Sequence, residues 1–366
     1  MRIAVAVTND LIADQRVGRT CSTLFENGYS VILIGRQLDD RQPLLRPYPC
    51  RRMRLLFRRG FLFYAEYNIR LFLRLLFLRF DMAYANDTDA LPACLLAAKL
   101  RRKKVFFDAH ELFPEVPELC GRRRVKQFWQ RIEDICIPRV DAMITVCQSI
   151  ADIYSRRYGI SVGVVRNLPV MESHLPTTPL SPPAILYQGA VNIGRGIDHI
   201  IDAMQFLPDC QFLIAGIGDQ YEMMQAYARS KPWHDRIHFL GRLSPKELHE
   251  LTPQATLGVC LLEPRGLNYY FAFPNRIGDF IAAGVPLLAT DLPEISRVVQ
   301  TYGVGYTIGY QKGEELAMLI ANAMKDWNAL PDKEKQTRFE KARHDLDWNK
   351  EKMVLLNAVH SVFSAQ

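Results

Sequence analysis

Short apolar runs alternate with amphipathic segments along the first half of the chain. The strand-like runs are 3–7, 31–35, 82–85, 105–109 and 141–146, and the helix-like segments are 14–27 and 89–100. Apolar strands separated by helices are typical of parallel βαβ units that are covered on both faces. The pattern therefore predicts an α/β domain over residues 1–168.

The alternation starts again after a Pro- and Ser-rich stretch at 176–184, which suits a connection between domains. The strand-like runs of the second half are 184–189, 211–218, 237–241, 255–262 and 286–290, with a helix expected over 196–207. Ser244, Pro245 and Glu247 are typical of a capped helix start. We predict a second doubly wound domain over 169–345, and a C-terminal helix over 346–366 that packs back on the first domain.

The composition agrees with a soluble protein of two domains. Of the 366 residues, 49% are hydrophobic and 23% are charged, and the formal net charge is +7. The eight cysteines form no C-x-x-C pair, so we expect free thiols in a reducing cytoplasm rather than a zinc site or a disulfide framework. The first ten residues lack the pattern of a signal peptide and suggest an opening strand.

Two glycine-rich turns follow strand-like runs in the second half. In GAVNIGRG (189–196), the glycines allow close approach of backbone to a phosphate, and Arg195 suits a diphosphate. An ordinary glycine-rich turn explains this loop equally well. Its spacing differs from a dinucleotide fingerprint, which argues against a dehydrogenase. In AGIGD (215–219), Gly216 and Gly218 let the backbone pass close to a ligand or a helix, and Asp219 is placed to cap a helix.

The segment FAFPNRIGDFIAAG (271–284) carries polar residues at a predicted helix start. Asp279 lies about one turn into the helix, where a carboxylate can accept hydrogen bonds from sugar hydroxyls. Arg276 lies in the first turn, where the helix dipole disfavours a cation, so an anionic partner would explain it. The alternative is a solvated arginine and a capping aspartate.

The order of these segments resembles a known family. YQGAVNIGRGIDHIIDAM, FLIAGIGD, IHFLGRLSPKELHEL and PNRIGDFIAAGVPLLATDLPEI are similar, over most of 184–300, to the nucleotide-sugar-binding domain of GT-B-fold glycosyltransferases of family 4 (group 1). DQRV, YANDTDALPA and FFDAHELFPE resemble the acceptor-side domain of the same family. The resemblance implies a GT-B fold, with two Rossmann-like domains that face each other across a cleft.

The resemblance also assigns roles at the donor site, with two departures. The family's phosphate-binding arginine falls on Ala190, whereas its lysine matches Arg195. Of two family glutamates, the second matches Asp279 at the ribose and the first falls on Phe271. Asn275 and Arg276 resemble an Asn-Lys pair of a subgroup, and our hypothesis is that Arg276 supplies the cation lost at 190. The expected residues for a UDP-, GDP- or ADP-type donor are Gly189, Gly194, Arg195, Gly216, Gly218, Asn275, Arg276 and Asp279.

In the first domain, His110 ends a strand between Asp108 and Glu111, which suits chemistry at the carboxyl end of a sheet. The resemblance places a cleft histidine at this position, and we take these three residues as catalytic candidates. A histidine satisfied by neighbours between the domains remains the alternative. The acceptor-side candidates follow the first strand, although the usual glycine pair is absent there: Asn9, Asp10, Asp14 and Arg16.

Residues 51–80 contain eight arginines and a single acid, Glu66. The apolar runs between the charges are too short to span a bilayer. A helix from about Phe61 would place an arginine stripe beside apolar side chains, as in helices that lie on anionic membranes. The alternative is a helix packed on the sheet with its arginines in water, and we expect both in part. Nucleic acid is a poorer explanation of the charge, because no binding motif accompanies it. The expected membrane contacts are Arg58, Arg59, Arg70 and Arg74.

Together these features predict a retaining glycosyltransferase of the hexosyltransferase type. It would move a sugar from a nucleotide diphosphate sugar to a lipid-linked or polysaccharide acceptor in cell-surface glycan synthesis, at the inner face of the cytoplasmic membrane. The family's mechanism implies front-face attack assisted by the leaving diphosphate, with no metal and no further cofactor. Two alternatives stay open: an inactive sugar-nucleotide-binding protein, and a different two-domain enzyme such as an epimerase or an NAD-dependent dehydrogenase.

Overall fold

The structure is a computed structural model that describes residues 1–366 except 13, 39–43, 120, 172–177 and 365–366. The chain divides into two compact units. Unit 1 comprises Met1–Asn167 with Glu351–Gln366, and unit 2 comprises Leu168–Lys350. The predicted boundary between the domains, at 168/169, lies one residue later. Each unit is a parallel sheet covered by helices, so the chain has the predicted doubly wound α/β architecture.

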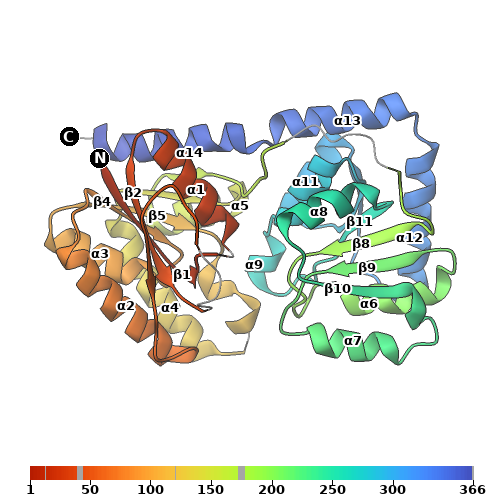
Figure 1. The fold of residues 1–366 in the computed structure, drawn as a ribbon, viewed down its shortest axis with the longest axis horizontal. Coiled ribbons are helices and arrows are strands. Elements are labelled where there is room, and N and C mark those ends of the chain that lie inside the picture. Colours follow the sequence, from red (N-terminus) through yellow and green to blue (C-terminus); the bar gives the residue numbers. More distant parts are fainter. Residues whose placement is uncertain (13, 39–43, 120, 172–177, 365–366) are drawn as a thin grey trace. The chain divides into compact units, whose positions relative to one another are not determined.

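Unit 1 has a seven-stranded parallel sheet in the order β3-β2-β1-β4-β5-β6-β7. The strands are β1 (Arg2–Asp10), β2 (Ser30–Arg36), β3 (Cys50–Met53), β4 (Met82–Asn86), β5 (Lys104–Ala109), β6 (Ala142–Thr145) and β7 (Val162–Val164). The helices are α1 (Gln15–Glu26), α2 (Gly60–Phe77), α3 (Leu91–Leu100), α4 (Arg123–Cys136), α5 (Gln148–Tyr158) and α14 (Trp348–Ser364). In Figure 1, α2, α3 and α4 cover one face of this sheet, and α1, α5 and α14 cover the other.

The central strands of unit 1 are apolar on both faces because helices cover both. Residues 3–7 of β1 and all of β4 are buried. The chain runs outward from β1 to β3 and then returns to form β4 beside β1. The carboxyl ends of β1 and β4 therefore mark the switch point of the sheet, where ligands bind in such folds.

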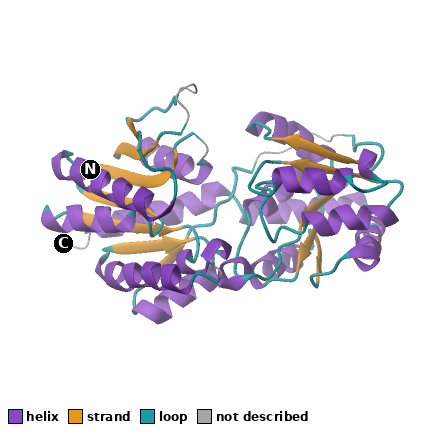
Figure 2. Cartoon of the chain, turned by 90° about the horizontal axis from the view of Figure 1, so that it is seen from below, coloured by secondary structure: helices purple, strands orange, loops and turns teal. Residues whose placement is uncertain are grey.

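Unit 2 has a six-stranded parallel sheet in the order β10-β9-β8-β11-β12-β13, with its switch point between β8 and β11. The strands are β8 (Ala184–Gln188), β9 (Gln211–Ala215), β10 (Ile237–Gly241), β11 (Leu257–Cys260), β12 (Leu287–Thr290) and β13 (Gly305–Ile308). The helices are α6 (Ile197–Ala203), α7 (Tyr221–Arg229), α8 (Pro245–Leu251), α9 (Gly266–Tyr270), α10 (Asn275–Ala283), α11 (Pro293–Tyr302), α12 (Gly313–Ala329) and α13 (Asp332–Asp345). Figures 1 and 2 show helices on both faces of this sheet too.

Two predictions about helix starts had different outcomes. The capping box before α8 is confirmed, because Ser244 Oγ accepts from the Glu247 amide at 3.3 Å and the Glu247 carboxylate accepts from the Ser244 amide at 2.7 Å. The cap at Asp219 is wrong. The residue that precedes α7 is Gln220, without a side-chain cap, and the Asp219 amide donates to Asn192 Oδ1 instead.

Candidate functional site

The carboxyl edge of the unit 1 sheet holds a buried ion pair between Asp108 and Arg16. Asp108 is the second-last residue of β5 and is fully buried, and its carboxylate lies 2.6 Å from Arg16 Nη2. Arg16 Nε donates to the same carboxylate at 3.3 Å, and Nη1 donates to the Val165 carbonyl at 2.8 Å. The hydroxyl of Tyr84 also donates to Asp108, at 2.9 Å. Burial alone would raise the pKa of Asp108, but the charges of Arg16 and His110 outweigh it and hold that pKa well below its usual range.

This pairing corrects the expectation that Arg16 meets the acceptor. All three guanidinium nitrogens donate to Asp108 or Val165, and the side chain is buried in α1. A buried arginine with these partners holds the edge of the sheet together instead of reaching a ligand. The type of residue was recognised from the sequence, but its partner lies 92 residues away.

His110 lies between two carboxylates. Its Nδ1 is 3.3 Å from Asp87 Oδ2, its Nε2 is 3.5 Å from Asp108 Oδ2, and its amide donates to Asp87 Oδ1 at 2.8 Å. Burial lowers the pKa of His110, but the charges of Asp87 and Asp108 outweigh it and raise it to about 9. The ring is therefore an imidazolium at neutral pH, which can donate a proton or stabilise negative charge but cannot act as a base.

The second acid at the ring is thus Asp87, where the sequence analysis had named Glu111. Asp87 holds its position in a left-handed backbone conformation, with φ +61°, directly after β4. Such a conformation is uncommon for a residue other than glycine, although aspartate tolerates it better than most. The polar run Asn86–Asp89 at the end of a buried strand was the signal that would have pointed to it.

Two more side chains of this run are buried, and each has one polar atom without a hydrogen-bond partner among the described residues. Asp89 accepts from the Thr8 hydroxyl at 2.6 Å through Oδ2, while its Oδ1 has no partner among the described residues. Asn86 donates to the Ala6 carbonyl at 3.0 Å, and its Oδ1 is likewise unpartnered. Burial raises the pKa of Asp89 to about 7. Polar atoms left without a partner in this way favour a ligand or a water at the switch point.

The other acceptor-side candidates fix the loop between β1 and α1. Asp14 caps α1, because its Oδ1 accepts from the Val17 amide at 3.0 Å, and Asn9 donates to its Oδ2 at 3.0 Å. Asp10 accepts from the amides of Ile12 and Leu38 at 3.0 and 2.8 Å. These bonds shape the loop at the switch point. Whether the loop also contacts an acceptor stays a prediction.

In unit 2, Arg276 is buried next to the first glycine turn. It is the second residue of α10, its exposed fraction is 7%, and its Cζ lies 4.2 Å from the centre of the Tyr187 ring. A Cβ built on Gly189 would come within 3.1 Å of its Nη2, so the guanidinium lies against that turn. Its Nη1 has no hydrogen-bond partner among the described residues. The alternative of a solvated arginine is therefore wrong.

The two glycine turns pack against each other. A Cβ on Gly216 would lie 1.8 Å from the Gly189 carbonyl oxygen, and a Cβ on Gly218 would lie 2.4 Å from the Val191 carbonyl oxygen. The absence of side chains at Gly216 and Gly218 therefore lets the second turn pack closely against the backbone of the first. The hydroxyl of Tyr187 also holds the first turn, because it donates to the Ala190 carbonyl at 2.5 Å.

Arg195 lies at the same end of the sheet as Arg276. Its guanidinium carbon is 4.6 Å from the centre of the Tyr269 ring, and its Nε is buried without a partner among the described residues. Both arginines act on the Cys260 thiol at the end of β11, whose pKa burial raises and the two cations partly lower. Gly194, Arg195, Arg265 and Lys312 line a hollow of about 360 Å³ together with Asp198 and Glu263, so its three cations outnumber its two carboxylates and the hollow is weakly basic.

Asn275 and Asp279 flank Arg276 on α10. Asn275 is exposed as the first residue of the helix, after Pro274. Asp279 lies one turn further and accepts from Gln188 Nε2 at 3.1 Å, which ties α10 to the end of β8. The predicted position of both residues at the start of a helix is confirmed.

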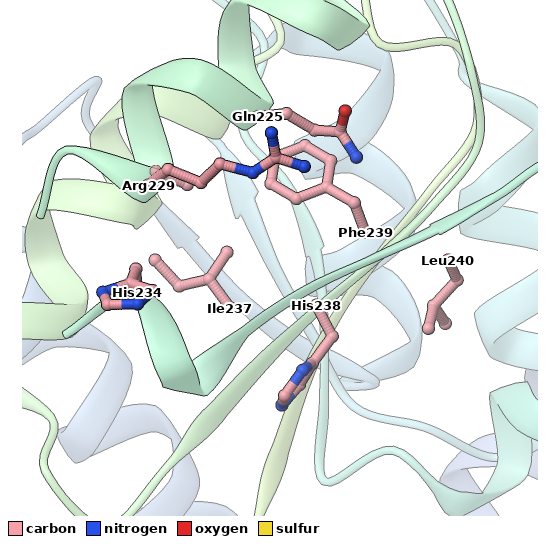
Figure 3. A pocket seen from close by; sticks show the side chains of 8 residues that line it. Gln225, Arg229, His234, Ile237, His238, Phe239 and Leu240 are labelled. Carbon is pink, nitrogen blue, oxygen red and sulfur yellow. The ribbon is translucent and has the colours of Figure 1, made fainter.

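A second hollow of unit 2, of about 400 Å³, lies between α7 and the edge strand β10. Figure 3 shows Gln225, Arg229 and the ring of Phe239 close together, with His234 and His238 below them. It contains none of the residues predicted to bind a donor. It is separated from the switch point of the sheet by β9, so the basic hollow and Arg276 remain the candidate site of this unit.

Comparisons with known proteins agree with this arrangement. Residues 176–345 match the family model of glycosyl transferases group 1, and residues 14–168 match that of glycosyltransferase family 4. The chain belongs to the GT-B glycosyltransferases of the family 4 type. The fold of sucrose-phosphate synthase from Thermosynechococcus elongatus superposes with a TM-score of 0.77 at 17% identity, over 100% of both chains. That of HepE from Anabaena, in complex with UDP, gives 0.76 at 14%, over 99% of this chain and 100% of HepE.

A characterised relative is similar over a shorter stretch. Alpha-D-kanosaminyltransferase of Streptomyces kanamyceticus is 24% identical over 149 residues, which is 39% of this chain and 37% of that protein. The match therefore spans little more than a third of that relative. Membership of the glycosyltransferase family leaves the epimerase and dehydrogenase alternatives without support.

This glycosyltransferase departs from its family at two positions that the structure now places. Ala190 lies in the first glycine turn, held by Tyr187, and has no side chain to reach a phosphate. Phe271 follows α9 and packs against Tyr270, with ring centres 4.9 Å apart. At these two positions the chain carries alanine and phenylalanine, and Arg276 is a cation that lies against the first glycine turn.

The basic segment forms an edge strand and a helix. Residues 50–53 pair with β2 as β3, and α2 starts at Gly60, close to the predicted Phe61. Arg70 donates to the Arg54 carbonyl at 3.1 Å and pairs with Glu66 at 2.7 Å, so it is engaged within the protein. Arg58, Arg59 and Arg74 are exposed. None of the described helices is long and apolar enough to cross a membrane.

Proposed function

We propose that the protein transfers a sugar from a nucleotide diphosphate sugar, of the UDP, GDP or ADP type, whose diphosphate binds in unit 2. The observation that carries this proposal is Arg276. A buried guanidinium with an unpartnered nitrogen is costly, and an anion offsets that cost. The N-terminus of α10 adds partial positive charge at the same place.

The position of Arg276 also suggests roles for the other predicted donor residues. Arg276 replaces the cation that Ala190 cannot provide, and Arg195 supplies the second one from the other side of the glycine turn. Asp279 accepts from the ribose hydroxyls, and Asn275 borders the phosphate. The turns contain four glycines, and the absence of side chains there lets their backbone approach the ligand: Gly189, Gly194, Gly216 and Gly218. The complex of HepE with UDP supports a uridine nucleotide as the first ligand to test.

The transfer itself is proposed to retain the anomeric configuration and to need neither a metal nor a cofactor besides the donor. The bond between the anomeric carbon and the diphosphate oxygen breaks, the acceptor oxygen bonds to that carbon, and the acceptor proton passes to the leaving diphosphate. Cations at the diphosphate stabilise the charge that develops on it. In unit 1, the imidazolium of His110, held by Asp87 and Asp108, is proposed to act on the transferred sugar, with Glu111 next to it in the chain.

The proposed acceptor is a lipid-linked or polysaccharide glycan of the cell surface. The loop of Asn9, Asp10 and Asp14 at the switch point of unit 1 would border it. The exposed arginines of residues 58–59 and 74 support a cytoplasmic protein that works peripherally at the inner face of the cytoplasmic membrane.

The test is calorimetric titration with UDP, GDP and ADP and their sugars. We expect one nucleotide diphosphate to bind, and Arg276→Ala to lose at least tenfold in affinity, because one charged contact to phosphate is worth roughly 1.5–3 kcal/mol. Arg229→Ala, at the exposed end of α7, is the matched control and keeps full affinity. Unchanged affinity of Arg276→Ala would refute the site. Donor binding without hydrolysis or transfer for any donor would identify an inactive binding protein.

A further inference from the structure

A loop before α2 is held rigidly by Glu66. The Glu66 carboxylate accepts from the Leu56 amide at 2.9 Å and from the Phe57 amide at 2.9 Å, and it pairs with Arg70. These backbone hydrogen bonds lower the pKa of Glu66, so the carboxylate is ionised at neutral pH. The loop that carries residues 56–59 is therefore fixed in place by the helix that follows it.

This fixed loop presents apolar side chains to solvent. Leu56 is 80% exposed and Phe57 is 43% exposed, and Phe61 in the first turn of α2 is 68% exposed. Single exposed apolar residues are ordinary, but a contiguous group on an ordered surface marks an interaction site.

The apolar group extends to α4 and is surrounded by arginines. The rings of Phe61 and Phe128 are in contact, with centres 5.9 Å apart, and Phe128 is itself 43% exposed. Arg58 and Arg59 belong to the loop, and the arginines at 122–124 lie at the start of α4. These five side chains are exposed and form no ion pair with any residue that the structure describes.

We propose that this surface docks on a membrane that contains anionic lipid. The docking patch consists of Leu56, Phe57, Arg58, Arg59, Phe61 and Phe128. Its apolar side chains would enter the boundary between headgroups and acyl chains, and its arginines would meet the lipid phosphates. The patch differs from the stripe expected from the sequence, because Arg70 is occupied by Glu66 and the apolar side chains contribute as much as the charge.

The patch lies close to the site residues of unit 1 in the layout of the sheet. In a doubly wound sheet, helix N-termini lie at the edge where the strands have their carboxyl ends. The patch is built from the N-terminal turns of α2 and α4, so it lies at the same edge of unit 1 as Asp108 and His110. The inference deepens the proposed function, since an enzyme docked here would meet an acceptor that is itself anchored in lipid.

The experiment is co-sedimentation of the full-length protein, without nucleotide, with vesicles of phosphatidylcholine alone or of one part phosphatidylglycerol to two parts phosphatidylcholine. We expect binding to the anionic vesicles and much weaker binding to the neutral ones. Arg58→Ser with Arg59→Ser should weaken partitioning roughly thirtyfold, since each basic side chain near such a surface contributes about 1 kcal/mol. Phe57→Ser with Phe61→Ser should weaken it by a comparable factor.

Phe77→Ser is the matched control, because Phe77 is 86% exposed at the opposite end of α2. It should leave vesicle binding unchanged, and all variants should keep the wild-type melting temperature because the side chains are exposed. Equal, negligible binding to both vesicles would overturn the proposal, and so would an equal loss with Phe77→Ser. Donor affinity is measured separately, so failure of the donor site and failure of the docking patch are distinguishable.

Discussion

The ring of Tyr187 lies under the guanidinium of Arg276, with the guanidinium carbon 4.2 Å from the ring centre. The hydroxyl of the same tyrosine holds the Ala190 carbonyl at 2.5 Å. One side chain at the end of β8 thus positions both the cation and the glycine turn. The two contributions can be separated, because phenylalanine keeps the ring and loses only the hydroxyl.

We predict that Tyr187→Phe weakens nucleotide diphosphate binding only a few-fold. The stacking of the cation survives on a phenyl ring, whereas the loop loses a hydrogen bond worth about 0.5–1.5 kcal/mol. Calorimetry with the tightest nucleotide, beside Arg276→Ala, measures the difference. A loss as large as that of Arg276→Ala would mean that the tyrosine hydroxyl itself contacts the ligand.

A second prediction concerns the buried pair of Arg16 and Asp108. Arg16→Met should lower the free energy of unfolding of unit 1 by about 3–5 kcal/mol, because it leaves a buried carboxylate without its main counter-charge. Arg16→Met combined with Asp108→Asn should recover part of that loss. Urea unfolding at neutral pH measures both. If Arg16→Met unfolds like the wild type and changes only the apparent affinity for acceptor, then Arg16 acts at the acceptor after all.

The pKa of His110 gives a pH dependence with a defined sign. The folded-state value is raised from 6.5 to about 9, so its contribution to stability is complete below about pH 6.5 and is lost as the pH rises through 9. Asp87, Asp108 and Arg16 face the ring. In the wild type, the unfolding free energy should therefore fall by roughly 2 kcal/mol between about pH 7.5 and 9.5, and His110→Gln should remove this fall.

The buried carboxyls Asp89 and Glu133 affect the pH dependence of the unfolding free energy only at lower pH. Burial raises the pKa of each to about 7, so they titrate below the window in which His110 loses its proton. Chemical denaturation of the wild type and of His110→Gln across that window is therefore a clean comparison. Parallel profiles for the two proteins would contradict an imidazolium held by Asp87 and Asp108.

Much of the fold could be predicted because its signals are local. Apolar runs such as 3–7 and 105–109 became β1 and β5, and the cap at Ser244 was read from three neighbouring residues. The edge strands β3 and β7 were not predicted, since only one side of each pairs within the sheet and all of their residues except Met53 are half-buried or exposed. Their sequences carry little apolar pattern.

The sequence predicted which residue types make up the candidate site, but not all of the contacts between them. Arg276 and Asp279 were found because a cation and an acid at a helix start contradict the apolar segment around them. The partner of Arg16 was not predicted, whereas the i, i+4 stripe of Glu66, Arg70 and Arg74 already placed Glu66 beside Arg70. Asp108 lies 92 residues from Arg16 along the chain, so their ion pair depends on tertiary packing, and a sequence shows only the residue types. Asp87 was overlooked because its role depends on a backbone angle.

The last prediction tests whether the two glycine turns form one unit with the donor site. Gly216→Ala should lower the free energy of unfolding of unit 2 by about 3 kcal/mol or more, because its Cβ would overlap the Gly189 carbonyl oxygen. The control is Gly313→Ala, at φ +61° with no atom within 4 Å of the added Cβ, which should cost only about 1 kcal/mol. Urea unfolding compares the two variants directly. Calorimetry should show nucleotide affinity falling with Gly216→Ala alone, since Gly189, which lies against Arg276, must shift to admit the methyl group. Equal stability and equal affinity for the two variants would show that the second turn moves freely and does not support the first.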